Sequence, residues 1–237
     1  MRIGVPKEIK NHEYRVGLAP SSVRELVSHG HAVVVQADAG IGIGASDDWY
    51  RQLGAQIVDD PAEIFAAAEM IVKVKEPQAK ERAMLRDGQI LFTYLHLAPD
   101  SDQTADLVKS GAICIAYETV TSPHGGLPLL APMSKVAGRM AIQAGAYCLE
   151  QPHGGLGLLL GGVPGVDPAK VVVLGSGVVG THATHIAVGM GADVWVIDRN
   201  PEVLESHWRQ FGRTTNTEFS TEDAIEQHVL EADLVIG

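Results

Sequence analysis

The sequence contains a glycine pattern that is typical of a dinucleotide-binding turn. Residues 171–180 read Val-Val-Val-Leu-Gly-Ser-Gly-Val-Val-Gly, a β-branched run that leads into G-x-G-x-x-G. In such a turn Gly175 permits a tight bend, Gly177 lets the backbone approach a diphosphate, and Gly180 lets the next helix pack closely. The free N–H groups at the N-terminus of that helix then bind the anion. This pattern predicts a nucleotide site.

Asp198 indicates which dinucleotide binds. It ends the next apolar run, 18 residues after Gly180, where an acidic residue accepts a hydrogen bond from the adenosine ribose. A carboxylate there favours the 2′-hydroxyl of NAD and repels the 2′-phosphate of NADP, although Arg199 next to it would soften that repulsion. We therefore expect NAD. The simpler alternative is a glycine-rich turn followed by a surface aspartate.

Three basic side chains lie at or just beyond the ends of apolar runs in the first half of the chain. They are Arg15, Lys75 and His96. In open α/β sheets, ligands bind outside the carboxyl ends of the strands, so these groups could converge on one small anionic substrate. An arginine suits a carboxylate, a lysine can polarise a carbonyl or imine, and a histidine moves protons near neutral pH. The alternative for each is an ordinary solvated or structural side chain.

Short apolar runs alternate with helical patterns along the chain, which is typical of βαβ units and a largely parallel sheet. The expected strands are 3–5, 32–35, 70–74, 90–94, 112–116, 171–174, 194–197 and 234–236. The expected helices are 21–29, 47–53, 61–68, 100–109, 134–151, 178–190, 201–211 and 221–229. The sequence thus predicts an α/β fold.

A Pro/Gly-rich connection at 122–132 breaks this alternation and is the expected domain boundary. We expect two Rossmann-like domains. Residues 1–128 would form a substrate domain. Residues 129–237 would form an NAD-binding domain that is incomplete at its C-terminus, with strands in the order 3-2-1-4.

Composition excludes several classes of protein. The chain has 237 residues, 46% of them hydrophobic, and a formal net charge of −11. So much apolar material argues against disorder, and the negative charge argues against nonspecific nucleic-acid binding. No apolar run reaches the roughly 18 residues of a membrane span, and the charged N-terminus lacks a secretory apolar run. We expect a cytoplasmic protein.

The two cysteines belong to no recognisable catalytic or metal-binding pattern. Cys114 and Cys148 lie among apolar residues and are expected to be buried thiols, with no metal site.

Several blocks of the chain resemble bacterial alanine dehydrogenases. The N-terminus RIGVPKEIK, with Arg15-Val16 after it, is similar to that family, as are VKVKEP at 72–77 and LFTYLHL at 91–97. Further similar blocks are 116–120, 132–134 with 137–141, and 161–166. The resemblance covers essentially the whole chain and implies reversible conversion of L-alanine, NAD and water to pyruvate, ammonium and NADH.

The resemblance also implies roles for individual residues. Arg15 would bind the substrate carboxylate, Lys75 would contact and polarise the substrate, and His96 would be the general acid/base. Cofactor contacts would come from Ser134, Gly175, Gly177, Val178, Val179, Gly180, Asp198 and Ser220, the last after the third strand of the nucleotide domain. Ser134 could equally be the N-cap of the long helix, since it follows Pro132.

The chain departs from the family at two positions. Val203 stands where the family commonly has a basic residue, which would weaken binding on the adenosine side. Ser176 lies between Gly175 and Gly177, where the family usually has another glycine. This change is mild because the residue between those two glycines is variable in G-x-G-x-x-G.

The resemblance bears on length and assembly as well. Alanine dehydrogenases continue beyond the point where this sequence stops, with further strands and a catalytic aspartate, and they form hexamers. We therefore expect this chain to retain nucleotide contacts at best, without normal turnover. We expect a homo-oligomer, hexameric as in the family.

Three alternatives remain open. The NAD-binding part of proton-pumping transhydrogenase shares the two-domain plan, but the blocks at 118–120 and 132–139, with Lys75 and His96, favour the alanine enzymes. Saccharopine and lysine dehydrogenases are more distant. The chain could also be a nucleotide-binding fragment without turnover.

Overall fold

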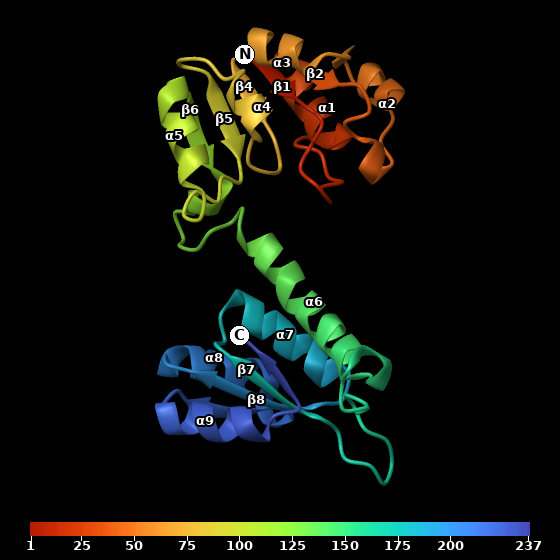
Figure 1. Ribbon diagram of the computed structural model, residues 1–237, viewed down its shortest axis with the longest axis vertical. Helices are drawn as coiled ribbons and strands as arrows, with labels where there is room; N and C mark the ends of the chain where they lie inside the picture. The colour runs from red at the N-terminus through yellow and green to blue at the C-terminus, as the bar shows by residue number, and fades with distance from the viewer. The chain divides into compact units, whose positions relative to one another are not determined.

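The computed structural model describes all residues, 1–237, and the chain divides into two compact units. Unit 1 comprises Met1–Leu129 and unit 2 comprises Leu130–Gly237. Each unit is built on a parallel sheet with helices on its faces, as the alternation of apolar runs and helical patterns predicts (Figure 1). No helix is both long and apolar enough to span a membrane.

Unit 1 contains a six-stranded parallel sheet in the order β3-β2-β1-β4-β5-β6. The strands are β1 (Arg2–Val5), β2 (Ala32–Gln36), β3 (Gln56–Val58), β4 (Met70–Val72), β5 (Ile90–Thr93) and β6 (Ile113–Ala116). The helices are α1 (Pro20–Ser28), α2 (Asp47–Gln52), α3 (Pro61–Ala67), α4 (Ala79–Arg82) and α5 (Ser101–Ser110), with short 3₁₀ turns η1 (Ile41–Ile43) and η2 (Tyr117–Thr119). The strand order reverses between β1 and β4, which is where open α/β sheets bind ligands.

The alternation of side chains along β2 explains why this sheet is covered on both faces. Val33 and Val35 pack in the same apolar cluster as Val23 of α1 and Tyr50 of α2. Val34, between them, packs in the cluster that contains Ile64 of α3. Because successive side chains of a strand point to opposite faces, a continuous Val-Val-Val run must be buried from both sides.

Unit 2 contains a four-stranded parallel sheet in the order β10-β7-β8-β9, which confirms the expected 3-2-1-4 arrangement. The strands are β7 (Lys170–Leu174), β8 (Asp193–Asp198), β9 (Asn216–Phe219) and β10 (Leu234–Ile236). The helices are α6 (Ala131–Leu149), α7 (Val178–Gly189), α8 (Pro201–Phe211) and α9 (Glu222–Glu231), with 3₁₀ turns η3 (Gln151–His153) and η4 (Gly212–Thr214).

Helix α6 packs closely against α7 at Gly138 and against β10 at Gly145. A Cβ added at Gly138 would collide with the carbonyl oxygen of Val179, and one added at Gly145 would collide with Leu234. Ile142 and Leu149 complete the buried face of α6. The close approach of the two helices places α6 beside the glycine turn at the start of α7.

Two details of α6 correct the expectations from sequence. The helix begins at Ala131 rather than at 134, because Pro132 fits the first turn, where its missing N–H would have no partner anyway. Ser134 therefore lies inside the helix and is not its N-cap, which is Leu130. Cys148 is exposed, not buried, because it lies outside the face of α6 that Gly138, Ile142, Gly145 and Leu149 bury.

Other expectations about the first unit also need correction. Cys114 is only half-buried, because β6 forms the edge of its sheet, although burial still raises the pKa of its thiol. β4 ends at Val72, two residues earlier than expected. The periodicity missed β3 and α4, which have three and four residues and are too short to show a period.

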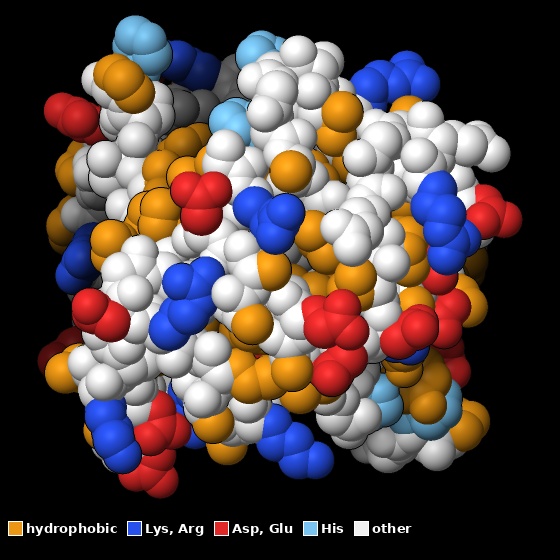
Figure 2. All heavy atoms as spheres, turned by 90° about the horizontal axis from the view of Figure 1, so that it is seen from above, with side chains coloured by type: hydrophobic (Ala, Val, Ile, Leu, Met, Phe, Trp, Pro, Cys, Tyr) orange, Lys and Arg blue, Asp and Glu red, His pale blue; other side chains and the backbone are white.

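The exposed surface fits the acidic composition. On the face drawn in Figure 2, Lys and Arg side chains are interspersed with Asp, Glu and hydrophobic side chains, and no continuous basic patch is present.

Candidate functional site

Unit 1 has a hollow of about 470 Å³ beyond the ends of its central strands. Arg15 and Gly17, from the loop after β1, form one side, and Lys73 and Val74, after β4, form another. Leu129 and an aromatic group from β5 and η2 complete the wall. The hollow thus lies at the reversal of strand order, where the topology alone predicts a ligand.

Arg15 is held in a fixed orientation by Glu13. One carboxylate oxygen of Glu13 accepts from the Arg15 backbone N at 2.9 Å and from Nε at 2.8 Å, and the other accepts from a terminal guanidinium nitrogen at 2.6 Å. Hydrogen bonding to Arg15 holds the pKa of Glu13 below its ordinary value, and the charge of Lys75 acts in the same direction. His12, with φ +60°, turns the chain just before this pair. A charge-assisted fork of this kind fixes the plane of the guanidinium.

The loop that carries Lys75 is anchored by a buried group of three charges. Lys73 Nζ lies 3.2 Å from Glu8 and 2.7 Å from Glu81, and all three side chains are buried. Glu8 also accepts from the backbone N of Val74 at 2.7 Å. Burial raises the pKa of Glu8, while the neighbouring Lys73 charge acts in the opposite direction. Charged groups persist in such a place only when paired and hydrogen-bonded, so this trio fixes the end of β4.

Lys75 itself is half-buried and is held through its backbone. Its carbonyl oxygen accepts from the Thr93 hydroxyl at 3.0 Å, and its N–H points to Glu8 at 3.4 Å. The structure therefore places Lys75 next to Lys73 and Val74, both of which line the hollow. Lys75 is not itself one of the lining residues.

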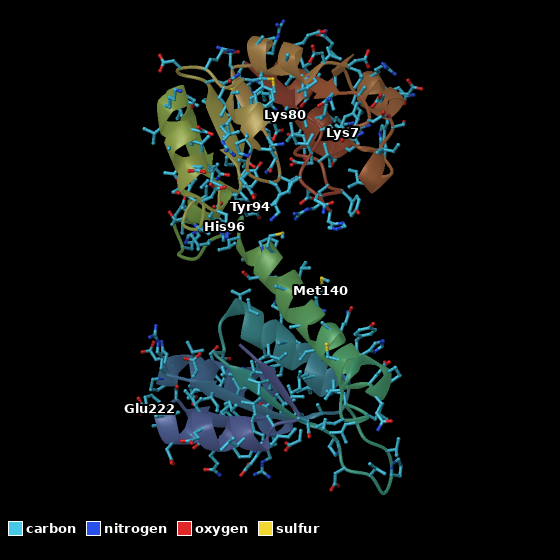
Figure 3. All side chains as sticks on the ribbon, in the orientation of Figure 1. Lys7, Lys80, Tyr94, His96, Met140 and Glu222 are labelled. Atoms are coloured by element: carbon cyan, nitrogen blue, oxygen red, sulfur yellow. The ribbon has the colours of Figure 1, made fainter.

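His96 lies beyond the end of β5 in an unusual backbone conformation. Its φ is +48°, a region that non-glycine residues seldom adopt. The Glu118 carboxylate accepts from the His96 N–H at 2.6 Å and from the Leu95 N–H at 3.0 Å, which stabilises this turn. The His96 side chain, which is labelled in Figure 3, is exposed and is not among the residues that line the hollow. Such a strained residue points to a functional position.

An aromatic group forms the wall behind Arg15. The ring of Tyr117 makes edge contacts with Phe92 at 4.3 Å and Tyr94 at 4.9 Å. Burial raises the pKa of both Tyr117 and Tyr94, although the charge of Arg15 acts in the opposite direction on the pKa of Tyr94. Both phenols therefore stay protonated at neutral pH. The Tyr94 hydroxyl donates to the Leu129 carbonyl at 2.5 Å. The wall is therefore rigid and carries no negative charge.

The glycine turn of unit 2 has the geometry that its sequence predicts. Gly175 has φ +95°, a conformation that favours glycine. A Cβ at Gly180 would collide with the Gly175 carbonyl oxygen, so α7 packs directly on the turn. A Cβ at Gly177 would meet nothing within 4 Å, so its backbone is open to a ligand.

This turn borders a hollow of about 400 Å³. Its lining includes Ser134, Gly175, Gly177, Val178, Val179 and Gly180, together with Ile236 of β10. The hollow thus lies between β7 and β10, at the reversal of strand order in the second sheet. All six of those predicted cofactor contacts are brought together here.

Asp198 and Ser220 lie at the ends of the next two strands. The two carboxylate oxygens of Asp198 accept from the backbone N of Ser176 at 2.7 Å and of Asn200 at 2.8 Å. Ser220 donates its backbone N–H to the Asp198 carbonyl at 3.0 Å. Asp198 thus shapes the turn while lying at the strand end, where a ribose hydroxyl would reach it. The open Gly177 backbone and this carboxylate fit a nicotinamide dinucleotide.

Comparison with known proteins shows the family. The family model "Alanine dehydrogenase/PNT, N-terminal domain" matches residues 4–137, and "Alanine dehydrogenase/PNT, C-terminal domain" matches residues 141–237. The chain belongs to the alanine dehydrogenase/PNT family. This confirms the resemblance found in the sequence.

Several similar proteins are named alanine dehydrogenases. The chain is 58% identical to one from Halomonas elongata and 50% identical to one from Mycobacterium tuberculosis H37Rv, over all of this chain and 64% of each relative. A solved structure titled L-alanine dehydrogenase matches with 53% identity and a TM-score of 0.93, covering 100% of this chain and 65% of that one. The chain therefore spans about two thirds of the length of these relatives.

The transhydrogenase branch of the alanine dehydrogenase/PNT family is less similar. The structure of transhydrogenase from Sinorhizobium meliloti matches with 26% identity and a TM-score of 0.79, covering 99% of this chain and 68% of that one. The lower identity favours the alanine dehydrogenase side of the family, as the sequence blocks indicate.

The sequence reasoning missed the acidic partners that position the basic groups. Glu13, Glu8, Glu81 and Glu118 were not identified as parts of the site. One signal was available: Lys73 interrupts an otherwise apolar strand end, and a lysine in a buried strand requires a carboxylate partner. No local pattern shows which carboxylates fold onto it.

Proposed function

We propose that this chain binds NAD through unit 2 and a small 2-amino or 2-oxo acid through unit 1, in the reversible oxidative deamination of L-alanine to pyruvate and ammonium. The hollow beyond β1 and β4 carries this proposal, because a fixed guanidinium faces an uncharged aromatic wall there. Membership of the alanine dehydrogenase/PNT family supports it.

Each basic residue takes one part of the chemistry. Arg15 binds the substrate carboxylate, for which a planar guanidinium is suited. Lys75 polarises the carbonyl or imine by placing a positive charge near its oxygen or nitrogen. His96 acts as the general acid/base, taking a proton from the water that adds to the imine carbon and returning one to the departing ammonia. When bound, NAD accepts the hydride from the substrate α-carbon.

The cofactor would lie along the glycine turn. The backbone of Gly175, Gly177, Val178, Val179 and Gly180 faces the diphosphate, with the start of α7 supplying N–H donors. Asp198 accepts from the adenosine ribose, and Ser134 and Ser220 make further contacts. On the adenosine side, Val203 lines a hollow of about 380 Å³ between α7 and α8, whose basic residues are Lys135, His182 and His207.

A homo-oligomer, hexameric as in the family, is part of the proposal. The connection between η3 and β7 exposes five large hydrophobic side chains, which a monomer would not need: Leu156, Leu158, Leu159, Val163 and Val166. A cytoplasmic location is also proposed, in keeping with two cysteines that form no disulfide.

Two measurements on the chain test the proposal. Isothermal titration with NAD and with pyruvate should show binding of each, and Arg15→Lys should weaken pyruvate binding at least tenfold while leaving NAD binding unchanged. An alanine-dependent assay of NADH formation then tests turnover. Binding without turnover would support the nucleotide-binding alternative, whereas absence of both would contradict the proposal.

A further inference from the structure

Ser176, the middle residue of the glycine turn, connects three elements of unit 2. Its hydroxyl lies 2.7 Å from Nδ1 of His207 on α8, and its backbone N–H donates to Asp198 at 2.7 Å. Ser176 is 6% exposed and His207 is 3% exposed. One residue thus joins the turn after β7, the carboxylate at the end of β8, and the middle of α8 (Figure 1).

We propose that Ser176 and His207 form a positioning pair for the dinucleotide site. The side-chain hydrogen bond ties the glycine turn to α8 and thereby holds the Ser176 N–H against Asp198. The bond from the Ser176 N–H fixes the orientation of the Asp198 carboxylate, on which the choice of NAD over NADP depends. The inference rests on the NAD binding proposed above.

The ring of His207 is held by packing and by this one hydrogen bond. The ring of His207 packs on Phe211 with centroids 4.5 Å apart, and its Nε2 is buried without a hydrogen-bond partner. Its only polar contact is therefore with Ser176. Burial lowers the pKa of His207, so the ring is neutral and stays in place at neutral pH.

The Ser176 side chain adds a tie to α8 beyond the bonds that Gly175 N–H donates to the Ile197 carbonyl and that the Ser176 carbonyl accepts from the Thr181 hydroxyl. Gly175 and Gly177 carry no side chain that could pack against a neighbour, and glycine is conformationally permissive. Between them, Ser176 is the one residue of the turn with a side chain, and it is directed to α8. Loss of the tie should allow the turn to move while the sheet and helices stay intact.

The test uses Ser176→Ala and His207→Phe, which remove the bond from either end. His207→Asn serves as the conservative variant, because an asparagine can place a polar atom near the position of Nδ1. Thr184→Val is the matched control: Thr184 is a buried α7 residue whose hydroxyl has no partner. Circular dichroism and thermal unfolding show whether each variant folds.

Two readouts are measured on the full chain. The first is amide hydrogen exchange of residues 175–180 without ligand, which should be faster in Ser176→Ala and His207→Phe and unchanged in Thr184→Val. The second is the pair of dissociation constants for NAD and NADP. In Ser176→Ala and His207→Phe, the dissociation constant for NAD should rise about fivefold, as expected for one lost hydrogen bond, and the dissociation constant for NADP should rise less. His207→Asn should recover most of both effects.

The outcomes separate this inference from the proposed function. Unchanged hydrogen exchange in Ser176→Ala and His207→Phe would overturn the positioning pair. It would also be overturned if the double variant Ser176→Ala, His207→Phe raised the NAD dissociation constant by the product of the two single effects, because a true pair loses its bond only once. An unchanged NAD to NADP ratio would overturn the role of the pair in selectivity. If the wild-type chain bound no NAD, the proposed function would fail, and hydrogen exchange would still decide whether the tie exists.

Discussion

The carboxylate of Glu118 accepts the backbone N–H of His96 at 2.6 Å, and this bond holds a non-glycine residue at φ +48°. The strain of that conformation is offset by two hydrogen bonds to a charged acceptor, since Leu95 N–H binds the same carboxylate. The position of the proposed general acid/base is thus determined by a residue 22 positions away in the sequence.

Replacing Glu118 should release this turn. Glu118→Ala leaves two backbone donors without their acceptor, and we expect a loss of about 1.5 kcal/mol in the free energy of unfolding. Hydrogen exchange of the Leu95 and His96 amides should accelerate. Glu118→Gln should show a smaller change because it keeps one oxygen acceptor. Glu226→Gln, at an exposed glutamate, is the control, and equal effects of the two glutamine variants would contradict the prediction.

Removing Lys73 should destabilise unit 1 strongly. Lys73→Met leaves Glu8 and Glu81 buried without their counter-charge, which costs about 3–5 kcal/mol in comparable buried pairs. Denaturant unfolding of the chain measures the loss. The triple variant Lys73→Met, Glu8→Gln, Glu81→Gln should recover much of it, because no unpaired charge then remains. A cost below about 1 kcal/mol for Lys73→Met alone would show that the three charges are not coupled.

Gly177 and Gly180 should respond differently to the same substitution. Gly177→Ala adds a Cβ to open space, so the unfolding temperature should be unchanged while NAD affinity falls at least tenfold. Gly180→Ala drives its Cβ into the Gly175 carbonyl oxygen, so both stability and NAD affinity should fall. Thermal unfolding and titration with NAD measure the two effects. Full NAD affinity in Gly177→Ala would mean that the ligand does not approach the turn there.

Stability should depend on pH through His207. Burial lowers its pKa from the ordinary value of 6.5, so between the two values the unfolded chain binds a proton that the folded chain does not. The folded state therefore loses stability as pH falls below about 6.5, by at most about 1.4 kcal/mol per pH unit. Unfolding measured from pH 7.5 to 5 should show this slope in the wild type. The slope should be smaller in His207→Phe, and identical slopes would contradict the prediction.

Much of the fold follows from local patterns. The Val-Val-Val runs, the Pro and Gly residues at helix ends, and the 18-residue spacing between Gly180 and Asp198 predict parallel α/β units and a dinucleotide turn. These features involve residues that are close together in the chain, so they can be recognised in the sequence as periodicity and spacing. The alternative that Ser134 is an N-cap is wrong. Pro132 is compatible with a helix that begins just before it or just after it, so the sequence does not show which.

The partners of the charged residues could not be found in this way. Arg15, Lys75 and His96 were recognisable by residue type and by their places after strands. Glu13, which orients Arg15, lies only two residues before it, but Glu8 and Glu118, which hold the backbone at Lys75 and His96, come from other segments. Glu8 reaches Lys73 across 65 positions, and Ser176 reaches His207 across 31. Such pairs form only when the strands come together in their final order, so spacing along the chain carries no record of them. The sequence by itself therefore identified the candidate groups from their residue types and positions. Only tertiary packing decided which of them are held in place and which side chains hold them.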